Sequence, residues 1–198
     1  MGDQAPRLSV IIPFWPKKEY HQGYLERCVR TLRGHDELIV VVNDGIGFAA
    51  AVNHGLRLAR GEYIAVINSD IELERGSLLD LARPNSIVSP TLNGDSQKFW
   101  GCCWVMDRRV YETIGLLDER FRIGYFEDDD YIIRAVRAGV VLECNPAVEI
   151  VSEGGVTMRT VDSHNQIFME NKNRFIEKWG AEPKDIPGHP HYDKHPHP

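Results

Sequence analysis

Four consecutive acids occupy residues 127–130, directly after the aromatic pair Tyr125 and Phe126. The dipole of a helix favours acids in its first turn, each by about 0.3–1 kcal/mol, which explains one or two of them but not four behind two aromatic rings. Like charges this close raise the pKa of at least one carboxyl group, which suits a general base. The run therefore predicts a catalytic site at the start of a helix, and the alternative is only a stabilised first turn.

A second polar group, Asn68-Ser69-Asp70, follows the apolar run of residues 63–67. The Asp70 carboxylate could hold a hard divalent cation, with phosphate oxygens and water as the other ligands. The alternative is a helix cap or an Asx turn. Gly45 and Gly47 could likewise bring backbone N–H groups close to a phosphate, or form only a turn.

The elements that position these residues can be read from the apolar pattern. Residues 8–12, 38–42 and 63–67 are short apolar runs that indicate buried strands, and residues 25–32 and 49–60 have helical periodicity. This β-α-β-α-β order predicts an α/β fold with a mostly parallel, twisted, Rossmann-like sheet and helices on both faces. In open sheets of this kind the ligand lies beyond the carboxyl ends of the strands, where residues 43–44 and 68–70 are expected.

Further elements follow along the chain. We expect helices at residues 77–82, 108–114, 129–138 and 166–179, and strands at residues 87–89, 102–106, 140–143 and 148–151. The pattern predicts a single domain over residues 1–180, followed by a Pro/His-rich tail over residues 181–198.

Composition narrows the class of protein. The 198 residues carry a net charge of −6, which disfavours a nucleic-acid partner. No apolar run approaches the roughly 18 residues of a membrane span, and no signal peptide is evident at the start. The four cysteines form neither a disulfide framework nor a C-x-x-C zinc pair, so we expect a cytoplasmic protein with reduced thiols.

Taken together, the motifs resemble those of family 2 glycosyltransferases of the GT-A fold, with rhamnosyltransferase-like members most similar. The resemblance covers residues 8–180. The matching segments, in chain order, are residues 9–13, 47–55, 59–63, 68–70, 108–110, 114–115, 117–121, 127–130 with Arg134, 154–157, 173–175 and 178–180. Each segment is weak evidence alone, but their order and spacing are specific.

The resemblance implies an inverting transfer of a sugar from a nucleotide diphosphate sugar to an acceptor hydroxyl, on an unidentified saccharide or other molecule. It implies that Asp70, in the position of a D-x-D motif whose first acid is Asn68 here, binds Mn²⁺ or Mg²⁺ on the diphosphate. Asp128 matches the general base of the family. Glu127 and Asp130 would position the acceptor and hold the helix.

The same resemblance assigns residues to the donor. Pro13 and Phe14 would flank the base or ribose, and Asp44, or alternatively Asn43, would bind the base. Asn53 and Arg134 are grouped with these donor-binding residues, and Arg134 is also placed to pair with one of the acids at 127–130.

The chain departs from the family pattern in three ways. It lacks the helix and strand that usually separate the acid after the second strand from the glycine at 47, so it looks like a trimmed member. Ser152 stands where many relatives carry a metal-binding His, for which His164, a tail histidine or water could substitute. No further domain to complete the acceptor site is visible, and a homodimer would supply one.

Two other functions remain open. The departures would also suit a nucleotide-sugar-binding module without catalysis. A nucleotidyltransferase shares the sheet topology, but residues 13–18 lack its Gly-rich loop with Arg and Lys.

Overall fold

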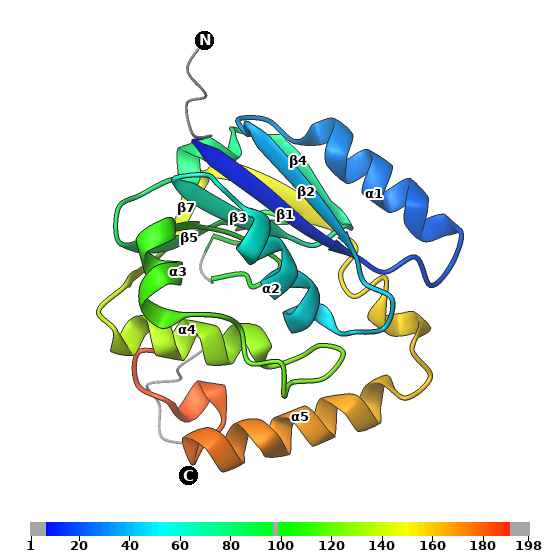
Figure 1. The fold of residues 1–198 in the computed structure, drawn as a ribbon, viewed down its shortest axis with the longest axis vertical. Helices are drawn as coiled ribbons and strands as arrows, with labels where there is room; N and C mark the ends of the chain where they lie inside the picture. Colours follow the sequence, from blue (N-terminus) through cyan, green and yellow to red (C-terminus); the bar gives the residue numbers. More distant parts are fainter. Residues whose placement is uncertain (1–6, 97–98, 191–198) are drawn as a thin grey trace.

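The computed structural model describes residues 7–96 and 99–190. Seven strands form one sheet in the order β2-β1-β3-β6-β5-β7-β4 (Figure 1). The strands are β1 (Leu8–Phe14), β2 (Glu37–Val42), β3 (Tyr63–Ile67), β4 (Ile71–Arg75), β5 (Ser86–Leu92), β6 (Cys103–Asp107) and β7 (Val141–Ser152).

Helices cover both faces of this sheet, as the sequence predicts. They are α1 (Tyr20–Thr31), α2 (Phe48–Leu58), α3 (Arg108–Ile114), α4 (Glu127–Arg137) and α5 (His164–Trp179), with short 3₁₀ turns η1 (Leu78–Leu81), η2 (Met158–Thr160) and η3 (Pro183–Asp185). Strand β1 shows why its sequence is apolar throughout. Its Ile11 packs into a core shared with α2 and α4, whereas Val10 and Ile12 pack into a second core with α1 and η1.

The sheet is mixed rather than mostly parallel. Strands β2, β1 and β3 pair in parallel, and so do β5 and β7, but β6 is antiparallel to both β3 and β5, and β4 is antiparallel to β7. The β-α-β-α-β pattern of the first 67 residues could not reveal this, because the reversal begins only after β3. A seven-stranded mixed sheet with helices on both faces forms a single domain.

Two strands differ from the expected pattern. The sequence reading missed β4, in which Ile71 and Leu73 are buried while Glu74 and Arg75 are exposed. The two strands expected at residues 140–143 and 148–151 are one strand, β7, whose pairing with β5 shifts register between Pro90 and Thr91. Pro146 lies in this irregular part of β7, between Asn145, which pairs with Pro90, and Glu149, which pairs with Thr91. Proline has no backbone N–H to donate, and it is tolerated here because the hydrogen-bond ladder is interrupted.

Helix α5 lies beyond α4, away from the sheet, and the chain then turns back along α4 (Figure 1). Within residues 7–96 and 99–190, no helix is both long enough and apolar enough to cross a membrane. A site can form between the sheet and α4. Its walls would come from the carboxyl ends of β1, β2 and β3 and from the first turn of α4.

Candidate functional site

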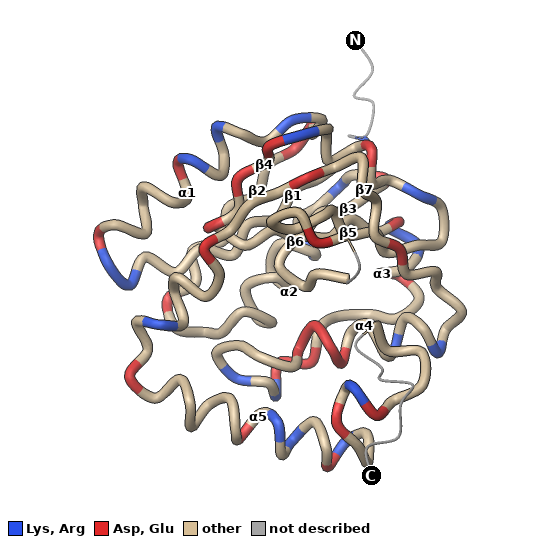
Figure 2. Tube along the Cα trace, turned by 180° about the vertical axis from the view of Figure 1, so that it is seen from behind, with Lys and Arg blue, Asp and Glu red and all other residues tan. Residues whose placement is uncertain are grey.

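A cavity of about 560 Å³ opens where these elements meet. Its walls include Pro13 near the end of β1, Asn43 after β2, Asn68 and Asp70 after β3, and Glu127 and Asp128 at the start of α4. Figure 2 shows the acids of α4 as a red stretch in the middle of the molecule, between the sheet and α5. The structure therefore brings both polar groups that the sequence singled out to one cavity.

Asp70 shares the cavity with other oxygen-bearing side chains that a divalent cation could use. The Ser152 hydroxyl donates a hydrogen bond to Asp70 Oδ2 over 3.3 Å, so Ser152 lies beside Asp70 even though it is not the histidine seen in many relatives. Within the described chain, the buried Oδ1 atom of Asn68 has no hydrogen-bond partner. Burial raises the pKa of Asp70, and a bound cation would favour the ionised form. This set of hard oxygen atoms suits Mn²⁺ or Mg²⁺.

Asp128 sits close against a glycine. A Cβ atom built on Gly101 would lie only 2.0 Å from Asp128 Oδ2, so this position accepts the carboxylate because it has no side chain. Burial, followed by the negative charge of Asp129, raises the pKa of Asp128 to about 7. The carboxyl group can therefore exchange a proton near neutral pH, as a general base must.

Glu127 precedes Asp128 and is more deeply enclosed, with 6% of its surface exposed. Burial and the charge of Asp128 raise its pKa well above the usual range. Its Oε2 atom has no hydrogen-bond partner among the described residues. A neutral Glu127 beside an ionisable Asp128 can donate a hydrogen bond into the cavity.

Asp130 and Arg134 form a buried network behind the cavity rather than part of its wall. Arg134 Nε is 3.0 Å from Asp130 Oδ2, which confirms the expected pairing of Arg134 with an acid of the run. The guanidinium also donates to the carbonyls of Ile114 and Leu116, and Trp179 donates to Asp130 Oδ1. These bonds fasten α4 to its neighbours, so neither side chain is free to contact a donor.

Asn53 is also committed to internal hydrogen bonds. Its amide exchanges hydrogen bonds of 2.9 Å in both directions with the backbone of Leu117 and donates to Glu119. The placement ties α2 to the segment before α4, and Asn53 does not line the cavity. Contrary to the expectation from the resemblance, Asn53 is therefore not placed to contact a donor in this cavity.

Three further residues named by the resemblance lie outside the cavity wall. Phe14 is buried in β1, and Asp44 is exposed on the outer side of the turn, so its neighbour Asn43 is the residue that lines the cavity. His164 begins α5, where its Nδ1 lies 3.3 Å from the carbonyl of Val161. No cluster of three or more His, Cys, Asp or Glu side chains suited to a metal occurs in the described residues, so His164 does not complete one with Asp70.

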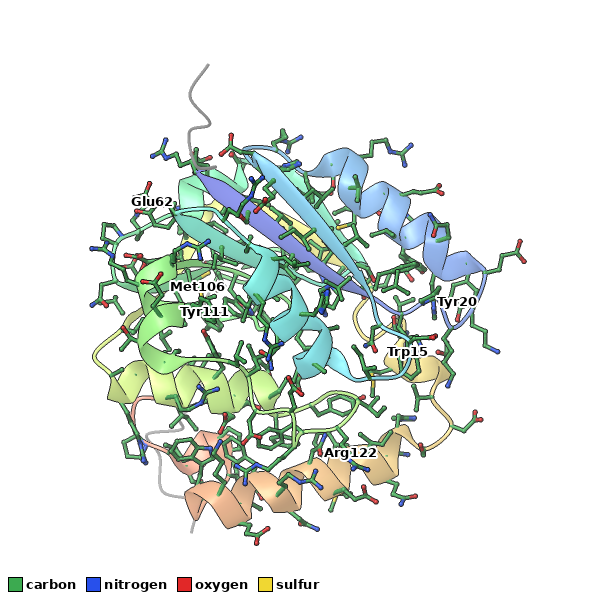
Figure 3. All side chains as sticks on the ribbon, in the orientation of Figure 1. Trp15, Tyr20, Glu62, Met106, Tyr111 and Arg122 are labelled. Carbon is green, nitrogen blue, oxygen red and sulfur yellow. The ribbon has the colours of Figure 1, made fainter. Side chains whose placement is uncertain are left out.

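Several lining residues escaped the sequence reading. Trp15 lies in the wall near Asn43, at the end of the first strand (Figure 3). Apolar and aromatic side chains line other parts of the wall: Phe48, Tyr125, Phe126, Val156, Met158 and Phe168. The sequence gives a signal for Tyr125 and Phe126, which precede the acids, and for Phe48 and Val156, which lie in the matching segments 47–55 and 154–157. Trp15, Met158 and Phe168 carry no such signal. They come from the end of β1, from η2 and from α5, whose approach to the sheet no local pattern specifies.

The segment after α5 also contributes to the site. Pro183 and Lys184 line the cavity, and Lys184 is the single lysine or arginine among the lining residues that the structure describes. Ile186 is buried in a cluster with aromatic rings of α5 and of the segment before α4, and His189 Nε2 lies 3.0 Å from Asp129 Oδ1. Residues 181–190 thus pack against the domain, while residues 191–198 of the expected tail lie outside the described part.

Comparisons with known proteins find similarity to glycosyltransferases. The model of the family "Glycosyl transferase family 2" matches residues 43–86. The chain is 22% identical over 186 residues to the low-salt glycan biosynthesis hexosyltransferase Agl10 of Haloferax volcanii, and the match covers 72% of this chain and 60% of that protein. The chain therefore spans about 60% of the length of this curated relative.

Two solved structures share the fold. A mannosyltransferase of Pyrobaculum calidifontis in complex with GDP-Man and Mn²⁺ aligns with a TM-score of 0.61 at 16% identity, over 93% of this chain and 68% of that one. GalNAc-T7 with UDP, GalNAc and Mn²⁺ aligns with a TM-score of 0.66 at 14% identity, over 93% of this chain and 50% of that one. These likenesses place the chain among proteins of the GT-A fold. Its sequence is similar to that of family 2 glycosyltransferases over residues 43–86.

Proposed function

We propose that the protein is an inverting, metal-dependent glycosyltransferase that moves a sugar from a nucleotide diphosphate sugar to an acceptor hydroxyl. The observation that carries the proposal is the placement of Asp70 and Asp128 in one cavity, with the Asp128 pKa raised to about 7. The relatives support the class of reaction, because they include a hexosyltransferase and a structure with GDP-Man and Mn²⁺.

In this proposal the donor lies along the ends of β1, β2 and β3. The flat ring of Trp15 and the side chains of Pro13 and Asn43 suit a nucleoside at one end of the cavity. Asp70, with the oxygen atoms of Asn68 and Ser152 beside it, would hold Mn²⁺ or Mg²⁺. When bound, such an ion neutralises negative charge on a leaving diphosphate.

The acceptor then approaches from the side of α4. Asp128 takes the proton of the acceptor hydroxyl as its oxygen forms a bond to the anomeric carbon. The bond from that carbon to the diphosphate oxygen breaks, and the nucleoside diphosphate leaves with the electron pair. Attack from the face opposite the leaving group inverts the configuration. A general base of this kind typically contributes about 10²–10⁴-fold to the rate.

The Asp128→Asn variant tests this assignment. We expect release of UDP or GDP from UDP- and GDP-sugars with Mn²⁺ to fall by about 10²-fold or more, while donor binding persists. Asp162→Asn, an exposed acid outside the cavity, serves as the matched control. Unchanged turnover in Asp128→Asn would rule out its role as base. Donor binding without release or transfer in the wild type would favour a nucleotide-sugar-binding module without catalysis.

Two expectations from the sequence remain proposals here. They are a cytoplasmic location and a homodimer that completes the acceptor site. The cytoplasmic location rests on the four free cysteines, three of which have thiol pKa values that burial raises strongly.

A further inference from the structure

The loop that leads into α4 has an unusual backbone. Ile123, Tyr125 and Phe126 have φ angles of 67°, 79° and 70°, in the left-handed region that residues with side chains rarely adopt. Phe126 directly precedes α4, so the path of this loop sets where Glu127 and Asp128 begin. Such a conformation persists only where surrounding contacts enforce it.

One buried side chain of α5 supplies such contacts. Asn171 is 1% exposed, and its Nδ2 atom donates hydrogen bonds to the carbonyls of Arg122, over 2.9 Å, and Gly124, over 2.8 Å. These two carbonyls flank Ile123. The Arg174 guanidinium donates to Asn171 Oδ1, which fixes the amide so that both of its N–H groups face the loop. Figure 3 shows Arg122 where the loop faces α5.

The start of α2 holds the other side of the same loop. The backbone N–H of Phe48 donates to the carbonyl of Ile123 over 2.9 Å. A Cβ atom on Gly47 would lie 3.0 Å from the nitrogen of Ile123, so the two backbones are in close contact. The loop at 122–126 is therefore held between α2 and α5, and Asn171 is the side chain that holds it from α5.

We propose that Asn171 is a positioning residue for the transfer reaction. It holds the loop at 122–126 so that Asp128 faces the cavity against Gly101. The inference rests on the proposed role of Asp128 as general base. Asn171 does not itself line the cavity, so its loss should affect the reaction and leave donor binding intact.

The test compares Asn171→Ala with Asn173→Ala, an exposed asparagine on the same helix. With Mn²⁺ and UDP-glucose or GDP-mannose as probes, we expect Asn171→Ala to lower kcat for nucleotide release at least tenfold and to leave the donor KM within twofold. Hydrogen exchange should accelerate at the amides of residues 122–128 and stay unchanged in β1 and β3. Asn173→Ala should behave as the wild type does.

The isosteric Asn171→Asp variant gives the same test if the alanine variant does not fold, because it keeps the volume and removes both donors. Unchanged exchange in the loop, or a kcat within twofold of the wild type in a folded variant, would overturn the inference. The two proposals fail differently. Normal turnover in Asp128→Asn refutes the base, whereas loss there with normal turnover in Asn171→Ala refutes only the positioning role.

Discussion

Replacing Gly101 by alanine should displace the Asp128 carboxylate without unfolding the protein. The new Cβ would lie 2.0 Å from Oδ2, whereas an ordinary contact begins at 3.4 Å, so the oxygen must move by about 1.4 Å. The displaced atom is the end of a side chain that can rotate, and Gly101 does not have a positive φ. The cost in stability should therefore be small.

The cost in catalysis should be large, because a misplacement of about 1 Å can lower a rate by about 10²-fold. That factor corresponds to about 2.7 kcal/mol in activation free energy. We expect Gly101→Ala to lower kcat for nucleotide release by this amount and to bind the donor normally. Gly23→Ala, at a half-buried position of α1 where the new Cβ would meet only the end of Arg27 at 3.9 Å, is the control, with unchanged turnover and up to about 1 kcal/mol of added stability. A folded Gly101→Ala enzyme with kcat within threefold of the wild type would refute the placement of the base.

Two further predictions concern the acids and the segment after α5. Turnover should fall below about pH 7 as Asp128 becomes protonated. Asp129→Asn removes a like charge, so it should lower the Asp128 pKa and move this fall in turnover to lower pH. A pH–rate profile in which the fall stays at the same pH, or moves to higher pH, would contradict this. A chain that ends at Gly180 loses the burial of Ile186, so its unfolding free energy in a denaturant titration should be lower by at least about 1.5–3 kcal/mol than that of a chain ending at Pro190. Equal stability would show that residues 181–190 do not pack as described.

The elements that sequence predicts best are those with strong local patterns. The strand expected at residues 63–67 and the helix expected at 108–114 match β3 and α3 without error, since both have uninterrupted patterns and clear end signals. The edge strand β4 was missed because charged residues make up more than half of its five positions. The pattern predicts two strands, at residues 140–143 and 148–151, whereas β7 continues from one to the other through Pro146.

The site was predictable where several polar residues lie next to one another in a single segment. Asp70 and Asp128 follow recognisable motifs, and the structure places both in one cavity. The choice between Asn43 and Asp44 was not readable, because neighbouring residues in a turn point in different directions. Gly101 and Asn171 carry no local signal, because their roles depend on residues far away in the sequence. Gly101 contacts Asp128, which lies 27 positions later, and Asn171 binds Arg122 and Gly124, which lie 49 and 47 positions earlier.

The most direct test of the account is thermal unfolding with a panel of nucleotide sugars, with and without Mn²⁺, on the wild type and on Asp70→Ala. A donor at about 100 times its Kd should stabilise the wild type by roughly 2.7 kcal/mol. We predict that this shift requires both Mn²⁺ and Asp70. Absence of a shift with every nucleotide sugar, or an equal shift in Asp70→Ala, would contradict a metal-dependent donor site at the end of β3.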